Sequence, residues 1–448
     1  MDWISLISAK RFGLEDYLPA HGSGSAGPYD LRSEFQRDYD RLVFSAPFRR
    51  LQNKTQVFPL PGSVFVHNRL THSLEVSCVG RSLGNNVSKA LLQRHPELEG
   101  SFVSEIGSIV SAACLAHDLG NPPFGHSGEQ AISTFFSEGR GRELRGRLSD
   151  AQWDDVVHFE GNANAFRLLT HQFVGRRRGG FVLTYSTLAA IVKYPYASSL
   201  AGRRSKFGFF ATEAESFRRI ADELHMLRLA DDPLRYARHP LVYLVEAADD
   251  ICYQLMDIED AHKLKLLTTD ETQGLLFGFF DAERQAHMRK TLNIVSDANE
   301  QIAYLRSSAI GLLTRECAAA FLEHEEEILA GHFEGTLIGH MSPLPLSAYR
   351  HCSEVARSRI YRSRDVLDIE LAGFRIIGTL LELMIDAVIS PDNAYSRLLI
   401  DRVSTQYDIQ SPDLGTRIQA VLDYISGMTD VFALDLYRKI NGTRLPDL

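Results

Sequence analysis

Apolar residues recur along most of the chain at the spacing of an α-helix. The runs are Phe35, Tyr39, Leu42 and Val43; Ile106, Ile109, Val110 and Ala113; Leu241, Val245, Ala248 and Cys252; and longer stretches near 281–332 and 365–390. In each run the apolar side chains fall on one helical face. Strict alternation of apolar and polar residues, which is typical of a half-buried strand, is scarce. The pattern therefore predicts an all-α protein.

A few short stretches break the helical pattern. An apolar stretch with prolines at 57–65 predicts the chain's one strand-like hairpin. Glycine and serine at 22–27 predict a flexible arm, and the segments rich in glycine and arginine at 139–147 and 175–180 predict mobile connections. A boundary near residue 270 separates a half rich in distinctive motifs from a half with few.

Composition predicts a large hydrophobic core and gives the chain a negative net charge. The chain has 448 residues, 44% of them hydrophobic, and a net charge of -9, so it is a poor general binder of nucleic acid. Two local basic clusters stand out, namely Arg140, Arg142, Arg145 and Arg147, and Arg176, Arg177 and Arg178. Each is either a solvated surface loop or a contact for a nucleotide effector or single-stranded DNA.

Cysteine usage and hydropathy predict a soluble, cytoplasmic protein. The five cysteines include no C-x-x-C pair, which suits a reducing compartment. The first residues lack the pattern of a signal peptide. The apolar stretch at 371–389 is interrupted by Arg375, Glu382 and Asp386, so it does not predict a membrane span.

His117 and Asp118 stand together at the end of the apolar run that begins at Ile106. The core face of that run continues through His117, which is therefore either an ordinary core histidine or a ligand. The neighbouring Asp118 favours the ligand, because a buried carboxylate is costly unless a cation or hydrogen bonds compensate. A bound metal ion would supply that compensation.

Two further residues complete a candidate metal site. His72 and Asp249 each lie in another helical run. Two imidazoles with two carboxylates suit Mn²⁺, Fe²⁺, Co²⁺, Ni²⁺ or Zn²⁺ better than Ca²⁺. Spacing alone leaves the set open, because any histidine of the chain can be paired with any carboxylate.

The order of these residues resembles a known superfamily. An arginine three residues before a histidine, a distant His-Asp pair and a late aspartate are similar to the HD superfamily of metal phosphohydrolases. Six motifs, in family order from about residue 37 to 437, resemble more narrowly the deoxyguanosine triphosphate triphosphohydrolases. They are 49–58 (RRLQNKTQVF), 69–76 (RLTHSLEV), 117–129 (HDLGNPPFGHSGE), 159–162 (FEGN), 248–251 (ADDI) and 427–430 (GMTD).

The resemblance implies an all-α HD fold, a divalent metal such as Mn²⁺ or Mg²⁺, and a homo-oligomer, either a hexamer or a tetramer. It implies that the metal ligands are His72, His117, Asp118 and Asp249. It further implies hydrolysis of deoxynucleoside triphosphates at the α-phosphorus, with release of intact triphosphate. The expected organisation is an N-terminal arm at 1–36, an HD-domain catalytic core at 37–270 and a C-terminal helical region at 271–448 packed on that core.

His126 and Glu129 resemble the family's catalytic pair. A carboxylate bonded to an imidazole fixes its tautomer and raises its basicity. The alternative is structural, because Ser127 and Gln130 fit the S-x-x-Q capping box and Glu129 would lie in the first turn of a helix. Asn121 departs from the family pattern, since some relatives carry a histidine there.

Two residues one and two turns after Asp249 share its helical face. Asp257 is expected to accept a hydrogen bond from the sugar 3′-hydroxyl. Tyr253 is expected to pack against C2′ and to exclude a 2′-hydroxyl. The alternatives are an exposed helix charge for Asp257 and a core aromatic for Tyr253.

Four more residues are predicted substrate contacts. Arg69 is expected to reach the α-phosphate, because its fork of donors suits phosphate, or else to form a structural salt bridge. By resemblance, Gln56 contacts the sugar or base, and Lys193 and Lys206 bind phosphates. Without the resemblance these three would be ordinary surface residues.

Two other functions compete with the triphosphohydrolase. One is an HD-type phosphodiesterase that acts on a signalling nucleotide or on nucleic acid, although the Gly-Tyr-Pro triplet of the cyclic dinucleotide branch is absent from the sequence. The other is a regulatory protein that binds DNA or an effector without catalysis. The complete set of candidate ligands argues against a dead site.

Overall fold

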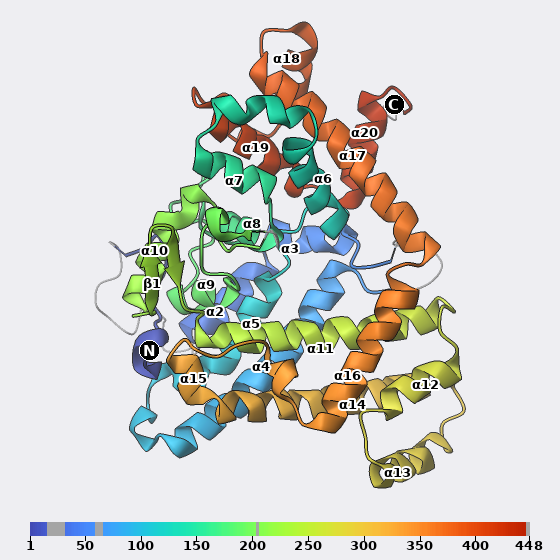
Figure 1. The fold of residues 1–448 in the computed structure, drawn as a ribbon. Helices are drawn as coiled ribbons and strands as arrows, with labels where there is room; N and C mark the ends of the chain where they lie inside the picture. The colour runs from blue at the N-terminus through green and yellow to red at the C-terminus, as the bar shows by residue number, and fades with distance from the viewer. Residues whose placement is uncertain (16–31, 59–65, 203–205, 445–448) are drawn as a thin grey trace.

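The computed structural model describes residues 1–15, 32–58, 66–202 and 206–444, and most of these are helical (Figure 1). In the first half the α-helices are α1 (Trp3–Leu6), α2 (Glu34–Val43), α3 (Ala46–Arg50), α4 (Arg69–Arg94), α5 (Ile106–Ala116), α6 (Gly125–Ser137), α7 (Asp150–Val157), α8 (Gly161–Thr170), α9 (Tyr185–Ile191) and α10 (Ala214–Glu223). In the second half they are α11 (Pro240–Lys263), α12 (Thr269–Phe277), α13 (Ala282–Leu292), α14 (Ala298–Glu323), α15 (Glu325–Leu329), α16 (Pro343–Val355), α17 (Arg364–Ile389), α18 (Ala394–Asp401), α19 (Leu414–Ser426) and α20 (Asp430–Ile440).

Shorter elements connect these helices. Short helical turns are η1 (Leu51–Asn53), η2 (Pro96–Leu98), η3 (Phe102–Glu105), η4 (Arg140–Arg147), η5 (Ser198–Leu200), η7 (Ala211–Glu213), η8 (Leu337–His340) and η9 (Ala356–Ile360). The strands of the described part are β1 (Arg228–Asp231) and β2 (Leu234–Tyr236), which pair as an antiparallel hairpin. The all-α prediction is confirmed.

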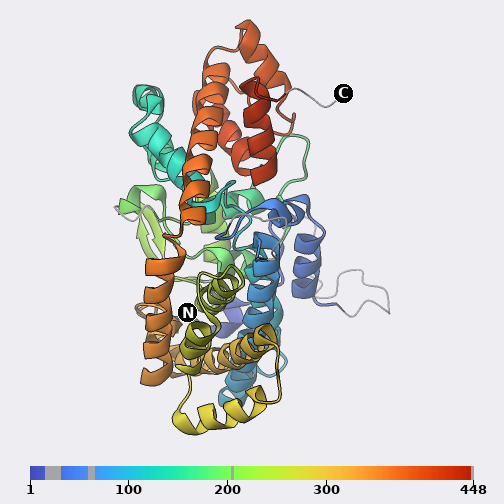
Figure 2. The same ribbon diagram turned by 90° about the vertical axis from the view of Figure 1, so that its right-hand side faces the viewer.

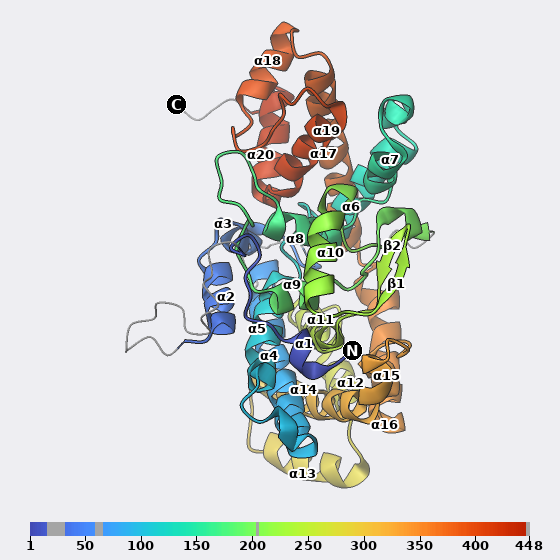
Figure 3. The ribbon, with the colours of Figure 1, turned by 90° about the vertical axis from the view of Figure 1, so that its left-hand side faces the viewer.

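The apolar side chains gather in two cores, one above the other in Figure 1. The lower core is built around α4, α5, α11 and α14, with α2 and α9 packed against α5. The upper core joins α6 and α7 to the C-terminal helices α17, α18, α19 and α20. Figure 2 shows an elongated molecule in which α17 continues upward from α16. From the other side, α8, α9 and α10 lie at the level between the two cores (Figure 3).

Two helix starts position the residues discussed below. Asn68 caps α4, because its side chain accepts a hydrogen bond from the Thr71 N–H while Thr71 bonds back to Asn68. By contrast, α6 begins without a side-chain cap, directly after Phe124 in a left-handed conformation with φ of 61°. The alternative of a capping box at Ser127 and Gln130 is therefore wrong, because Ser127 lies within α6.

The local predictions have mixed outcomes. Helices α2, α5, α11 and α17 confirm the runs recognised in the sequence. The hairpin β1–β2 was not predicted, so the stretch at 57–65 is not the chain's one strand-like piece. Most of that stretch, and the predicted arm at 22–27, lie outside the described residues. The boundary near residue 270 stays a prediction.

No helix in the described ranges is both long enough and apolar enough to cross a bilayer.

Candidate active site

Three helices bring the candidate metal ligands together. His72 lies in the first turns of α4, His117 directly follows α5, and Asp249 lies within α11. The Nε2 atoms of His72 and His117 lie 3.1 Å and 3.5 Å from Asp249 Oδ1. One ligand atom from each of the three residues lies within 4.8 Å of the others, which is the spacing of a metal site.

The orientation of His117 fits a metal ligand. Its Nδ1 donates a hydrogen bond to the Cys114 carbonyl at 2.6 Å, so Nε2 is left with the lone pair. Nε2 is buried and has no hydrogen-bond partner in the described part of the chain. A buried nitrogen that faces a carboxylate without a donor between them is well suited to hold a cation.

The charges of this cluster also favour a cation. Burial alone would lower the pKa of His117, but the carboxylates of Asp118 and Asp249 outweigh burial and raise that pKa to about 9. Burial would raise the pKa of Asp249, but the two imidazoles outweigh it and hold that pKa well below its usual range. The cluster thus keeps Asp249 ionised and stabilises positive charge between the rings.

Asp118 lies beside this three-residue cluster and is held by its neighbours. Its Oδ1 is 3.7 Å from His117 Nε2, and its Oδ2 accepts a hydrogen bond from Arg69 at 2.7 Å. The Asn121 side chain also donates to Oδ1. Burial would raise the pKa of Asp118, but Arg69 and the imidazoles lower it. Asp118 is therefore an ionised neighbour of the cluster, and its part in metal binding stays a prediction.

Arg69 packs against the first residue of α6. A β-carbon on Gly125 would lie 2.5 Å from Arg69 Nη2, and Gly125 has a φ of +56°, so a side chain there would strain the backbone and displace the guanidinium. Arg69 is buried and lines the same cavity as Asp118. The predicted salt bridge is present, and the predicted phosphate contact is compatible with it because a guanidinium has five donors.

His126 and Glu129 contact each other near the start of α6. His126 Nδ1 lies 3.0 Å from Glu129 Oε2, and this hydrogen bond raises the pKa of His126. Glu129 Oε1 accepts a hydrogen bond from the Gly161 N–H at 2.7 Å, so the carboxylate is fixed between two helices. The His126 side chain is 69% exposed, so it can reach a substrate. The catalytic role of the pair stays a prediction.

One cavity of about 310 Å³ collects most of the predicted site. Eight predicted residues line it: Arg69, His117, Asp118, His126, Glu129, Lys193, Lys206 and Asp249. His72 borders it through its contact with Asp249. Gln56, Tyr253 and Asp257 are not among its described lining residues.

The two lysines of the cavity are bound by carboxylates that sequence analysis missed. Lys193 Nζ lies 2.9 Å from Glu246, and Lys206 Nζ lies 2.7 Å from Glu160. Burial of Lys193 would lower its pKa, but Glu246 outweighs burial and raises it. Glu160 belongs to a recognised motif, but nothing in the sequence shows which cation either glutamate meets.

Asp257 is buried, so the alternative that it is an exposed helix charge is wrong. It accepts a hydrogen bond at 2.6 Å from the hydroxyl of Tyr361, a residue for which the sequence carries no signal. Burial raises the pKa of Asp257 to about 8. The ring of Tyr253 lies 6.3 Å from the His72 ring and 5.9 Å from the Tyr361 ring. These residues form an aromatic and acidic group beside the candidate metal ligands.

The motif at 427–430 has a structural explanation. Asp430 accepts hydrogen bonds from the backbone N–H groups of Thr55 at 2.8 Å and of Phe124 at 2.9 Å. Lys54 donates to the carbonyls of Asn121 at 2.6 Å and of Ser426 at 2.9 Å. The start of α20 therefore ties together the segment before α4 and the strained turn that begins α6.

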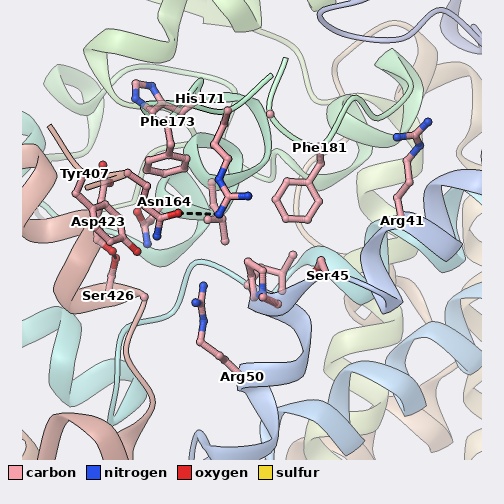
Figure 4. Close-up of a pocket in the computed structure, with 18 of the residues that line it drawn as sticks. Arg41, Ser45, Arg50, Asn164, His171, Phe173, Phe181, Tyr407, Asp423 and Ser426 are labelled. Atoms are coloured by element: carbon pink, nitrogen blue, oxygen red, sulfur yellow. Dashed lines mark hydrogen bonds between the residues drawn. The ribbon is translucent and has the colours of Figure 1, made fainter. Parts of the chain in front are cut away.

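The two basic clusters differ. In the first, Arg140 pairs with Glu382, and Arg145 pairs with Asp150 and packs on the Trp153 ring. In the second, Arg176 and Arg177 line another cavity, and neither has an acidic partner within 4.0 Å among the described residues. Arg140 and Arg145 of the first cluster are thus paired on the surface, whereas Arg176 and Arg177 of the second face a hollow (Figure 4).

An all-α fold with a His and Asp cluster drawn from three helices, beside a cavity lined by carboxylates, an arginine and two lysines, is typical of a phosphohydrolase of the HD type. A family model described as HD domain matches residues 69–158, and one described as Phosphohydrolase-associated domain matches residues 340–439. The chain is an enzyme of this hydrolase class.

Curated relatives narrow the class. The chain is 38% identical to a "Deoxyguanosinetriphosphate triphosphohydrolase-like protein" of Pseudomonas aeruginosa, over 100% of both chains. It is 37% identical to a protein of the same name in Synechocystis, over 99% of this chain and 100% of the other. It is 30% identical to a "Deoxyguanosinetriphosphate triphosphohydrolase" of Yersinia enterocolitica, over 93% of this chain and 95% of the other. The chain belongs to the deoxyguanosinetriphosphate triphosphohydrolase family.

Proposed function

We propose that this enzyme hydrolyses deoxynucleoside triphosphates, dGTP or several of them, at the α-phosphorus to give a deoxynucleoside and triphosphate. The observation that supports this best is the cavity of about 310 Å³, which is lined by His117 and Asp249 of the cluster and by an arginine and two lysines. The names of the relatives point to the same reaction.

In this proposal His72, His117, Asp118 and Asp249 would hold a divalent ion, which would supply an activated water and neutralise phosphate charge. Mn²⁺ or Mg²⁺ are the proposed ions. Arg69 binds the α-phosphate from the side opposite its contact with Asp118. Lys193 and Lys206 bind the remaining phosphates after exchanging Glu246 and Glu160 for phosphate oxygens.

His126 moves the proton in the proposed reaction. Glu129 holds Nδ1, so Nε2 is the atom that exchanges a proton with the water or with the leaving 5′-oxygen. Gln130 Nε2 lies 3.1 Å from that nitrogen, and this contact must break for the exchange.

Preference for deoxy substrates is proposed to come from α11. Tyr253 packs against C2′, and Asp257 bonds the 3′-hydroxyl in competition with Tyr361. Gln56 is proposed to contact the sugar or base; its Oε1 is buried without a hydrogen-bond partner among the described residues, which leaves it available to a ligand.

The remaining proposals concern the cellular compartment, the oligomeric state and the ligand of a basic cluster. We propose that the enzyme works in the cytoplasm as a homo-oligomer, a hexamer or a tetramer, and that a basic cluster binds a nucleotide effector or single-stranded DNA. Size-exclusion chromatography with light scattering measures the oligomer directly.

The reaction is tested by product identification. Purified protein with Mn²⁺ or Mg²⁺ is given each deoxy- and ribonucleoside triphosphate, singly and in pairs. Deoxynucleoside and tripolyphosphate in equal amounts are expected. Release of pyrophosphate or orthophosphate would refute the cleavage position. Hydrolysis of cyclic dinucleotides or oligonucleotides, without triphosphate release, would favour the phosphodiesterase.

A further inference from the structure

Glu246, the carboxylate that holds Lys193, has a second cationic partner. Its Oε1 lies 2.9 Å from Lys193 Nζ, and its Oε2 accepts a hydrogen bond from Arg238 Nη1 at 3.0 Å. Glu246 is buried, whereas both cations are partly exposed. One buried carboxylate is therefore shared between a cation that is proposed to bind substrate and a cation that the proposed function does not use.

Arg238 lies behind the wall of the first cavity. It belongs to the short segment between β2 and α11 and is not among the described lining residues of that cavity, whereas Glu246, Lys193 and Tyr194 are. Its guanidinium lies 5.3 Å from the centre of the Tyr243 ring and 5.7 Å from that of the Tyr194 ring. Two rings and one carboxylate restrict the guanidinium, so we expect Arg238 to stay in place when a ligand enters the cavity.

The pairing of Glu246 decides whether Lys193 is free to move. In the proposed function Lys193 leaves Glu246 for a phosphate oxygen. A buried carboxylate that loses its only counter-ion is strongly disfavoured, so an acid without another partner would compete with the phosphate for the lysine. Glu246 lies within α11, where the backbone N–H groups are used by the helix, and the described residues supply no partner for its side chain besides Lys193 and Arg238. Arg238 is thus what keeps Glu246 paired after the lysine has moved.

The other lysine of the cavity leaves a carboxylate that also stays bonded. Glu160, the partner of Lys206, accepts hydrogen bonds from the backbone N–H and the side-chain amide of Asn162, each at 2.8 Å. These bonds exist because Glu160 caps the start of α8. A helix start therefore stabilises the carboxylate behind one lysine, and an arginine stabilises the carboxylate behind the other.

We propose that Arg238 is a positioning residue that neutralises Glu246 when Lys193 moves to the triphosphate, and that it thereby sets the affinity of the cavity for substrate phosphates without contacting them. This inference rests on the proposed function, in which Lys193 binds a phosphate. Because that contact is made before and during the reaction alike, Arg238 acts on substrate binding and not on the chemical step.

The first test compares KM with kcat, using the deoxynucleotide that the unaltered enzyme hydrolyses fastest. In Arg238→Gln we expect KM to rise about 10- to 100-fold while kcat changes less than about threefold, because Glu246 then holds Lys193 back. Arg238→Lys keeps the charge and should restore most of the affinity. The matched control is Arg228→Gln, which also breaks a pair with a carboxylate at 2.7 Å and a contact with a tyrosine ring, but outside the described lining of the cavity. A fall in kcat with an unchanged KM would overturn the proposal.

A double-mutant cycle separates this role from a merely structural one. Glu246→Gln removes the charge that Arg238 is proposed to neutralise. In that background Arg238→Gln should raise KM less than about threefold, since no carboxylate is left to hold Lys193 back. An equal rise in both backgrounds would show that Arg238 acts only by packing against the two tyrosine rings, and would refute the proposal. Thermal unfolding checks that each variant is folded; Arg238→Met, which keeps an apolar stem between the rings, replaces Arg238→Gln if that variant unfolds.

Binding of tripolyphosphate, measured by isothermal titration calorimetry, follows the same exchange without turnover. Its Kd should rise about 10- to 100-fold in Arg238→Gln and should not rise further when Arg238→Gln is added to Glu246→Gln. Lys193→Gln is expected to lose the same affinity, which identifies the titrated site. If the unaltered enzyme releases no triphosphate from any deoxynucleotide, the proposed reaction fails, but this titration still decides the role of Arg238. Unchanged affinity in Arg238→Gln, or no binding of tripolyphosphate to the unaltered enzyme, would overturn that role whatever the reaction.

Discussion

Two cavities lie on either side of segment 117–121: the first, of about 310 Å³, holds the candidate metal ligands, and the second is lined by Arg41, Arg50, Arg176 and Arg177. They differ in whether their cations have acidic partners. In the first, every cation named above has a carboxylate partner, as in Arg69 with Asp118 and Lys206 with Glu160. In the second, the arginines have no acidic partner in the described part of the chain. A phosphate entering the first cavity must displace carboxylates, whereas a phosphate entering the second relieves repulsion.

This difference bears on selectivity. Paired charges hold fixed geometries before a substrate arrives, which favours a reaction that depends on orientation. Unpaired arginines bind many phosphate ligands but discriminate little, and exposed ones are strongly screened by salt.

The largest predicted effect comes from breaking the paired cluster at Asp249. In Asp249→Asn one anionic ligand is lost while the volume is kept. Loss of partners that merely orient ligands costs about 10- to 100-fold, so loss of a ligand is expected to lower kcat more than about 100-fold. Bound Mn²⁺, measured by elemental analysis, should fall with it. Asp401→Asn, on the exposed end of α18, is the control. Full activity in Asp249→Asn would remove this residue from the site.

The next effect concerns His126. In Glu129→Gln the imidazole loses the carboxylate that raises its pKa, so that pKa falls. We expect kcat to decrease about 10- to 100-fold and the limb of the pH–rate profile that reports His126 to move to lower pH. Glu138→Gln, exposed just beyond α6, should change neither. A lower kcat with an unmoved profile would mean that Glu129 only supports the Gly161 N–H.

A smaller effect is expected at Asp430, which links the segment before α4 to the turn that begins α6. Asp430→Ala leaves the N–H groups of Thr55 and Phe124 buried without acceptors, which costs about 2–4 kcal/mol of unfolding free energy in urea. Since Phe124 begins the helix that carries His126, kcat should fall as well. Asp392→Ala, whose side chain is 100% exposed, provides the baseline. Equal stability of the two variants would contradict the structural role of Asp430.

The comparison also shows what sequence can reveal. The helix that ends at His117 was predictable, because its apolar spacing is local and the His-Asp pair has distinctive chemistry. The partners of the lysines were not, since Glu246 and Glu160 meet them only through tertiary packing. The second cavity could be predicted only in part. Arg176 and Arg177 stand in an obvious cluster, but Arg41 and Arg50 look like ordinary helix cations until α2 and α3 are folded against the loop after α8.

The smallest predicted effect tests how much free energy of unfolding is lost when a buried, unpaired carboxylate ionises. Asp155 of α7 is buried and accepts one hydrogen bond, from the Ala211 N–H at 2.8 Å. Burial raises its pKa from 3.8 to about 7, so the folded state binds a proton that the unfolded state has released. Its contribution to stability is therefore lost as pH rises from about 4 to about 7. In Asp155→Asn this loss is absent.

Urea unfolding of Asp155→Asn and of the unaltered chain at pH 4.5 and pH 8 measures the effect. We expect the variant to gain about 1–3 kcal/mol on the unaltered protein between the two pH values, whatever its stability at either one. Asp154→Asn, on the neighbouring and more accessible position of α7, should show no such gain. If the two variants respond alike, the lone buried carboxylate of Asp155 is tolerated without cost.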